Sequence, residues 1–226
     1  MSAAAPQLVP VREPAHADGV VLVLHGGASR GDRVMVSPTQ LSVIRMIPTA
    51  RAVARAGRGR LAVYRLLNSY RGWDSEHTPV ADTDWAVDRV RERYADAPVG
   101  LVGHSLGGRA ALVAGDNPAV RSVVALNPWV YPDEDVDLAG RRVLFVHGRR
   151  DRIASPQRAE SVARRVSRTT DVGFIWIPDG KHAMVRHGRD FDQYAAQFTA
   201  AVLLDDPSRA TGPVGRVLAG ESWVTA

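Results

Sequence analysis

The 226-residue sequence is long enough for one domain with a sizeable core, and 45% of its residues are hydrophobic. It contains no cysteine, which excludes disulfides, a thiolate nucleophile and thiolate metal ligands. The net charge of +5 comes from dispersed arginines that no nucleic-acid-binding motif accompanies, so we expect no nucleic-acid partner.

The N-terminal residues 1–18 contain prolines and charged residues but no apolar run of the kind found in a secretory signal peptide. We therefore predict a flexible N-terminal segment on a soluble, cytoplasmic protein. The strongly apolar runs, such as Val20–Leu24, are strand-sized and too short to cross a bilayer, so we expect no membrane partner.

From residue 19 to residue 205, short apolar runs alternate with segments of helical periodicity, a pattern typical of a mostly parallel sheet. The sequence thus predicts a single domain built as a three-layer α/β/α sandwich. The predicted strands are Val20–Leu24, Leu61–Leu67, Val99–Val102, Ser122–Leu126, Arg142–Val146 and Phe174–Ile177. The predicted helices are about Ser37–Ala56, Asp82–Tyr94, a short one after Gly107, Pro156–Val166 and Asp190–Leu204. Residues 206–226 show no clear period and are interpreted as a loosely attached C-terminal tail.

The sharpest signal is Gly103-His104-Ser105-Leu106-Gly107, which lies between an apolar strand and a helix. In such a G-x-S-x-G turn the serine sits on a strained connection, and the flanking glycines let the backbone pass closely without a Cβ clash. The N-terminus of the following helix also favours developing negative charge. The context therefore favours a nucleophilic Ser105 over a glycine-rich turn that only packs a helix on the sheet.

Together with His25-Gly26-Gly27 upstream, this motif resembles the α/β-hydrolase superfamily, over roughly Val20 to Leu204. Further stretches are similar to small, capless bacterial serine hydrolases of the dienelactone-hydrolase-like group. These stretches are Tyr70-Arg71-Gly72-Trp73, residues 82–90, and His147-Gly148 before Asp151. Dienelactone hydrolases themselves carry a cysteine where this chain has Ser105.

The resemblance implies an oxyanion hole made of two backbone N–H groups, those of Leu106 and Gly27. A loop with paired glycines at a strand end can aim an amide inward, where a fixed donor stabilises a tetrahedral oxyanion. The alternative for Gly26-Gly27 is a simple turn, because glycine is a common turn former.

A serine nucleophile needs a base, and His182 is the candidate among seven histidines. It lies in the loop after the last predicted strand, beside a glycine that permits a sharp approach, and the resemblance also places the base there. His187 is the alternative base.

The acid that orients the base is predicted to be Asp151, which follows the strand Arg142–Val146 and therefore lies at the same sheet edge. The order Ser105, Asp151, His182 is the order expected of this fold. The rival acids follow the preceding strand and are Asp133, Glu134 and Asp135.

Trp73 and Trp129 follow strands at the edge where α/β sheets bind ligands, and Met184 neighbours His182. We predict that these three side chains line the substrate site, with apolar packing under loops as the alternative. Because the connection from Leu126 to Arg142 leaves no room for a cap domain, we expect an open site with little apolar wall. Such a site favours short or soluble acyl groups.

These features predict a serine hydrolase that cleaves an ester, thioester or lactone of a small or soluble substrate through an acyl-enzyme. The predicted partner is a small-molecule acyl substrate, with no metal and no cofactor, and the sequence gives no oligomeric state. An acyltransferase with the same triad and a non-catalytic hydrolase-like binding protein are the alternatives.

Six basic residues fall in loops that this fold would place at the catalytic edge. A converging cationic rim would attract anionic substrates, whereas dispersed side chains would simply point to water. These residues are Arg71, Arg149, Arg150, Arg152, Lys181 and Arg186.

Overall fold

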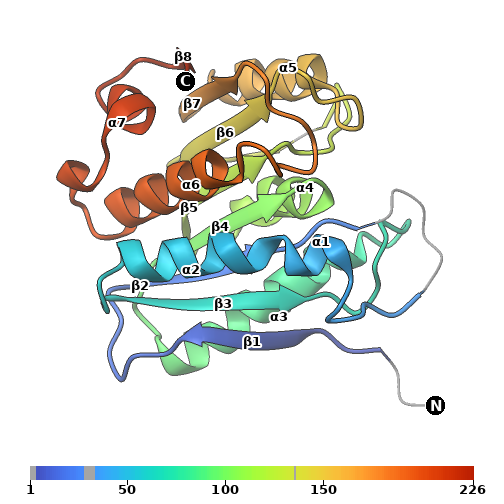
Figure 1. Cartoon of the computed structure of the whole chain (residues 1–226). Coiled ribbons are helices and arrows are strands. Elements are labelled where there is room, and N and C mark those ends of the chain that lie inside the picture. Colours follow the sequence, from blue (N-terminus) through green and yellow to red (C-terminus); the bar gives the residue numbers. More distant parts are fainter. Residues whose placement is uncertain (1–3, 28–33, 135) are drawn as a thin grey trace.

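The computed structural model describes residues 4–27, 34–134 and 136–226, and over these residues its centre is one eight-stranded sheet (Figure 1). The strand order is β1-β3-β2-β4-β5-β6-β7-β8. Only β1 runs antiparallel to its neighbour, β3. The strands are β1 (Gln7–Arg12), β2 (Gly19–Leu24), β3 (Leu61–Leu67), β4 (Val99–His104), β5 (Val120–Leu126), β6 (Arg142–Gly148), β7 (Asp171–Ile177) and β8 (Trp223–Thr225).

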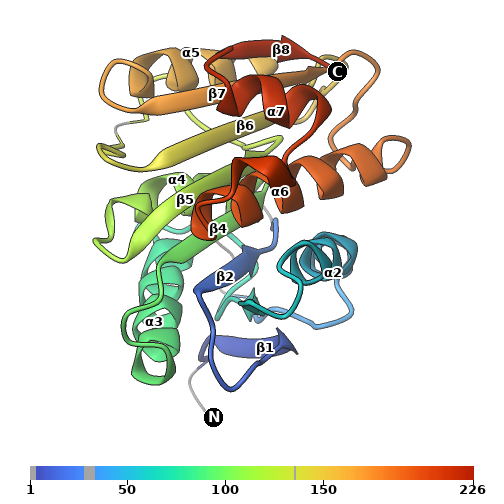
Figure 2. The same ribbon diagram turned by 90° about the vertical axis from the view of Figure 1, so that its left-hand side faces the viewer.

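Helices cover both faces of the sheet (Figure 2). One face carries α3 (Thr78–Arg93), α4 (Leu106–Val113) and α5 (Pro156–Val166); the other carries α2 (Met46–Ala56), α6 (Gly188–Leu203) and α7 (Gly212–Leu218). The described residues also form two 3₁₀ turns, η1 (Ala114–Asp116) and η2 (Pro207–Arg209), and the short α1 (Leu41–Ile44). The predicted three-layer sandwich is confirmed. In the parts of the chain that the structure describes, no helix has both the length and the apolar character needed to cross a bilayer.

The buried strand β2 shows why the sheet needs helices on both sides. Val20, Leu22 and Leu24 belong to the core cluster under α3, α4 and α5, whereas Val21 and Val23 belong to the cluster under α2 and α6. Successive side chains of a strand point to opposite faces, so a continuous apolar run must be covered twice.

The helix predicted from Ser37 to Ala56 is divided at Arg45 into α1 and α2. Pro48 lies in the first turn of α2, where its missing N–H costs no helical hydrogen bond, so the proline does not interrupt that helix. The helix predicted from Asp82 starts four residues earlier, at Thr78.

The two terminal segments expected to be loose belong to the fold. Residues 7–12 form β1 at the sheet edge, where Pro10 is tolerated. The predicted C-terminal tail contains α7, whose Val214 is fully buried, and β8, which pairs with β7. Each of these elements has too few apolar residues to show a period, and burial against the sheet orders them.

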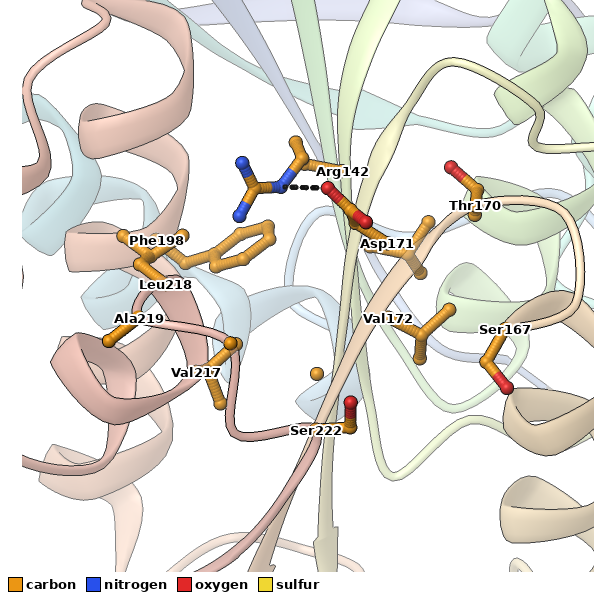
Figure 3. Close-up of a pocket in the computed structure, with 13 residues that line it drawn as sticks. Arg142, Ser167, Thr170, Asp171, Val172, Phe198, Val217, Leu218, Ala219 and Ser222 are labelled. Atoms are coloured by element: carbon orange, nitrogen blue, oxygen red, sulfur yellow. Dashed lines mark ion pairs between the residues drawn. The ribbon is translucent and has the colours of Figure 1, made fainter.

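The C-terminal segment also lines a cavity of about 420 Å³ at the amino ends of β6 and β7 (Figure 3). Arg142 and Asp171, which begin these strands and lie opposite each other in register, form an ion pair of 3.4 Å in its lining. Val217 and Ser222 from the C-terminal segment line its other side. This cavity lies at the sheet edge opposite the carboxyl ends of the strands, which carry the site described next.

The connection between β5 and β6 comprises residues 127–141, and its described part, all but residue 135, contains no helix or strand. The predicted absence of a cap domain therefore agrees with the structure, and the described residues beside Ser105 come from loops, the end of β4, the start of α4 and the short α1.

Candidate active site

Ser105 lies on the turn from β4 to α4 with the strained backbone angles φ 56° and ψ −119°. Such strain costs of order 1–3 kcal/mol and persists only where the surroundings fix it. Here the backbone packs so closely that a Cβ on Gly103 would lie 2.0 Å from the carbonyl oxygen of Gly107, and one on Gly107 would lie 2.5 Å from that of His25. The Ser105 N–H also donates to the Leu126 carbonyl at 3.0 Å. The G-x-S-x-G sequence thus forms a tight strand-to-helix turn with Ser105 at its apex.

His182 and Asp151 approach Ser105 from the loops after β7 and β6. Nε2 of His182 lies 3.0 Å from Ser105 Oγ, and Nδ1 lies 2.8 Å from a carboxylate oxygen of Asp151. Because a carboxylate only accepts hydrogen bonds, Nδ1 carries the proton and Nε2 is free to accept the serine proton. The structure therefore brings the three predicted residues into one hydrogen-bonded chain.

The Asp151 side chain has no solvent exposure and is held by several donors. Its Oδ1 accepts from the backbone N–H groups of Ile153 and Ala154 at 2.8 and 2.9 Å, and its Oδ2 lies 3.5 Å from Nε2 of His147. Burial alone would raise the pKa of Asp151, but the hydrogen bonds from His147, His182 and the Ile153 N–H outweigh it and hold this pKa well below its usual range. Asp151 therefore stays charged wherever His182 can act as a base.

Asn127, which the sequence did not indicate, holds the loop of His182 in place by hydrogen bonds. This fully buried side chain donates from Nδ2 to the carbonyl oxygens of Lys181 and His182 at 3.1 and 3.2 Å. Its Oδ1 accepts from the N–H of Gly148 at 2.8 Å. One amide thus joins the end of β6, which leads to Asp151, to the His182 loop. The one feature of the sequence that could have pointed to Asn127 is its place directly after a buried strand, in Asn127-Pro128.

His104, beside the nucleophile, forms a further hydrogen bond with the same loop. Its Nε2 donates to the His182 carbonyl at 2.9 Å. Burial and the neighbouring His182 lower the pKa of His104 to about 3, so the ring is neutral and this nitrogen carries its proton. His104 therefore helps to shape the loop that carries His182.

Gly27 and Leu106, the residues implied for the oxyanion hole, both line the cavity that holds Ser105. The His25 ring accepts the Asn68 N–H at Nε2 (3.2 Å), so its Nδ1 donates to the Gly26 carbonyl at 2.6 Å. In a trans peptide the C=O and N–H point in opposite directions, so the Gly27 N–H points away from that ring. Leu106 is the first residue of α4, where the N–H has no partner within the helix.

The cavity beside Ser105 measures about 590 Å³, a size typical of small-molecule sites. Contrary to the expected lack of an apolar wall, its lining is mainly apolar, because α1 and the loops after β6 and β7 turn large side chains toward it. Two of these are strongly exposed: Leu41 is 82% and Val185 is 84% accessible. The apolar wall comprises Leu41, Ile44, Leu106, Trp129, Ile153, Ala183 and Val185.

Of the three side chains predicted to line the substrate site, only Trp129 lies at this cavity. The prediction is wrong for Trp73, which is buried under the guanidinium of Arg109 at 3.9 Å from its ring centre. It is also wrong for Met184, which is 1% exposed and packs in the core under α6. Both follow strand ends, but their loops turn these side chains inward.

Arg109, one helical turn after Ser105, is a buried cation that supports the wall formed by Trp129. It pairs with Glu134 at 2.8 Å, and both side chains are less than 10% exposed. The aromatic rings of Trp73, Trp129 and Tyr131 surround the guanidinium. This pair therefore ties the loop after β5 to the helix of the nucleophile.

The rival triad residues lie elsewhere or have other partners. His187 bonds to Asp190 at 3.0 Å at the start of α6. Glu134 forms an ion pair with Arg109, Asp133 is exposed, and Asp135 lies outside the described residues. Among the residues that the structure describes, no three His, Asp or Glu side chains gather as metal ligands.

The doubly covered parallel sheet and the serine, histidine and aspartate at its carboxyl edge define an α/β hydrolase. A family model described as serine aminopeptidase, S33, matches residues 15–143, more than half of the chain, and the chain belongs to this family. A search with this chain matches no curated protein sequence. The narrower resemblance to dienelactone hydrolases stays a prediction.

Solved structures of other α/β hydrolases show the same fold at low sequence identity. Est1E from Butyrivibrio proteoclasticus has a TM-score of 0.63 and 13% identity, over 88% of this chain and 94% of its own. The esterase Pf2001 from Pyrococcus furiosus has a TM-score of 0.64 and 13% identity, over 88% and 93%. An α/β serine hydrolase without a lid from Xanthomonas campestris has a TM-score of 0.60 and 19% identity, over 92% and 90%.

Proposed function

We propose that this protein is a serine hydrolase that cleaves an ester, thioester or lactone through an acyl-enzyme. The observation that carries the proposal is the hydrogen-bonded chain from Ser105 through His182 to Asp151, built on a strained strand-to-helix turn. Ser105 Oγ attacks the acyl carbon while His182 takes its proton and Asp151 stabilises the imidazolium. The proton then passes to the leaving group, and water releases the acid by the same steps.

The oxyanion of the tetrahedral intermediate would be held by the N–H groups of Gly27 and Leu106. Both residues line the cavity of Ser105, and a Cβ on Gly27 would lie 1.8 Å from the Arg71 carbonyl oxygen, so only glycine fits there. Donors fixed before the reaction stabilise developing charge without reorganisation, and one such donor is typically worth about 10²–10³ in kcat.

The charges around the site favour an ester over the free N-terminus of a peptide, which an aminopeptidase must bind. Among the described residues that line the cavities at Ser105 and His182, Asp151 supplies the one carboxylate, and it is buried behind His182. The other charged groups in the two linings are Arg149, Arg150, Arg152 and Lys181, and Arg45, which is paired with Asp192. An α-ammonium group would meet repulsion from the basic residues and no accessible carboxylate among the described lining residues.

A fluorophosphonate probe tests the nucleophile directly. The wild-type protein should be labelled on Ser105, and Ser105→Ala should not be labelled. Ser42→Ala is the matched control, because Ser42 lines the same cavity and should not alter labelling. Absence of labelling would indicate a non-catalytic binding protein, and product analysis with added alcohols would reveal an acyltransferase.

The apolar cavity predicts that longer acyl groups are better substrates over the first few carbons. Each buried CH₂ contributes about 0.8 kcal/mol, so kcat/KM should rise by up to about fourfold per CH₂ from acetate to hexanoate. Leu41→Ser should flatten this rise, whereas Met35→Ser, which changes another exposed apolar residue outside the cavity, should not. Equal kcat/KM values for all chain lengths would contradict an acyl site in this cavity.

A further inference from the structure

Four basic side chains gather in a second cavity beside the triad, and the pairing of β6 with β7 brings them together. Gly148 lies opposite Ile177 at the ends of these strands, and the Arg150 N–H donates to the Gly180 carbonyl at 3.0 Å. The loops after the two strands therefore run side by side. Their cavity measures about 670 Å³ and is lined by Arg149, Arg150, Asp151, Arg152, Ile153, Lys181, His182 and Ala183.

The cationic charge of this cavity is largely uncompensated. Arg150 pairs with Asp179 at 3.0 Å, and both groups are exposed. The Arg149 guanidinium lies over the ring of Trp176 at 4.6 Å. Within the described ranges no carboxylate forms an ion pair with Arg149, Arg152 or Lys181. Asp151, the one acid in the lining, is buried and bound by histidines.

Only four of the six predicted rim residues gather here. Arg71 and Arg186 are exposed but line neither this cavity nor the one at Ser105. Arg45, the cation in the lining of the cavity at Ser105, pairs with Asp192 at 3.3 Å. The unpaired cations among the lining residues therefore lie on one side of the site, on the loops that carry Asp151 and His182.

The basic cavity and the apolar cavity meet at His182, because both are lined by Ile153, His182 and Ala183. A ligand that lies in both must pass the imidazole that moves the proton. Ser105 belongs to the apolar cavity alone. The two parts of an ester thus have separate surroundings: the acyl group stays on Ser105, and the departing group leaves past His182.

We infer that the substrate joins an apolar acyl group to a leaving group that carries negative charge. This inference rests on the proposed function. The acyl chain lies against Leu41, Ile44 and Val185. The leaving alcohol or thiol carries a separate anionic group, and this group lies among Arg149, Arg152 and Lys181. When the bond from the acyl carbon to the leaving oxygen or sulfur breaks, His182 gives that atom its proton, and the acyl group remains on Ser105 until water releases it as the acid.

Three hexanoate-sized esters separate the position of the charge from its presence. The first has 4-hydroxybenzoate as leaving group, the second the neutral 4-hydroxybenzamide, and the third is an adipate monoester of 4-hydroxybenzamide, with its charge on the acyl end. At low salt, kcat/KM should be about tenfold higher for the benzoate than for the benzamide ester, and this advantage should shrink at high salt. The adipate ester should be the poorest of the three.

The double variant Arg152→Gln/Lys181→Gln should lower kcat/KM for the benzoate ester about tenfold more than for the benzamide ester. Both side chains are exposed, so the fold should persist. Arg121→Gln is the matched control, because this exposed arginine lies at the amino end of β5, at the opposite edge of the sheet, and should leave the ratio unchanged.

Equal kcat/KM values for the benzoate and benzamide esters at both salt levels, or preference for the adipate ester, would overturn the inference. Turnover that survives Ser105→Ala would instead overturn the proposed function. A second measurement does not need turnover: hexyl phosphate should slow fluorophosphonate labelling of Ser105 more than hexanol does. Equal protection by the two compounds would also overturn the inference.

Discussion

Replacing His182 with alanine is expected to lower kcat for ester hydrolysis by about 10⁴–10⁶, as much as Ser105→Ala does. Among the described residues, the His182 imidazole is the one group within hydrogen-bond distance of Ser105 Oγ that can take its proton. Because the two residues act in the same step, the double variant should be no slower than either single one. Steady-state rates of the three variants with one ester measure this directly.

His187→Ala supplies the control for that comparison. His187 lies five residues further along the same loop and bonds to Asp190 instead of Ser105. Its replacement should change kcat by less than about threefold, because no part of the triad is removed. A severe loss in His187→Ala with a mild one in His182→Ala would show that the base is wrongly assigned.

The residues that the sequence identified best are those whose chemistry requires a local pattern. The strained turn at Ser105 needs glycines at fixed positions, so it appears in the sequence as Gly103-His104-Ser105-Leu106-Gly107. Asp151 and His182 follow apolar runs, and parallel strands bring such positions to one edge. Burial on both faces also made the central strands visible as apolar runs.

The features that the sequence missed depend on contacts between distant segments. Asn127 is 54 and 55 residues from the carbonyl groups that it binds, and nothing local marks it except its place after a strand. Trp73 and Met184 stand at strand ends, but the direction of a side chain in a loop is set by its packing partners. The same holds for β8, whose pairing with β7 supplies an order that three residues cannot indicate alone.

Asn127→Ala is expected to destabilise the protein by about 3–5 kcal/mol. The substitution leaves the carbonyl oxygens of Lys181 and His182 and the N–H of Gly148 without their partner, at about 1–3 kcal/mol for each group that water cannot reach. It also puts alanine at φ 42°, which asparagine tolerates better. For a chain of this size, Tm should fall by roughly 6–20 °C.

The same substitution should lower kcat by about 10–100-fold, because His182 loses one of the two bonds that fix its carbonyl and shifts relative to Ser105. Asn117→Ala is the matched control. The Asn117 side chain bonds to Asp84 of α3 and to the N–H of Ala119, just before the amino end of β5, so its replacement should leave kcat unchanged. An unchanged kcat in Asn127→Ala would mean that His104 alone positions the base loop.

Asn127→Asp separates the loss of the two donated bonds from the loss of side-chain volume. A carboxylate there would face the carbonyl oxygens of Lys181 and His182, so its pKa should be raised above the value of about 3.9 that it has in the unfolded chain. A raised pKa in the folded state means that the folded protein binds the proton more tightly than the unfolded chain does. The contribution of this carboxyl group to the free energy of unfolding is therefore greatest at low pH and falls as pH rises. The loss of stability relative to the wild type should therefore grow between about pH 4 and pH 7, as urea unfolding would measure. At pH 4 the protonated acid can still donate one bond to the loop, so the variant should approach the wild type there. A stability difference that does not change with pH would show that the amide of Asn127 does not hold these carbonyl groups.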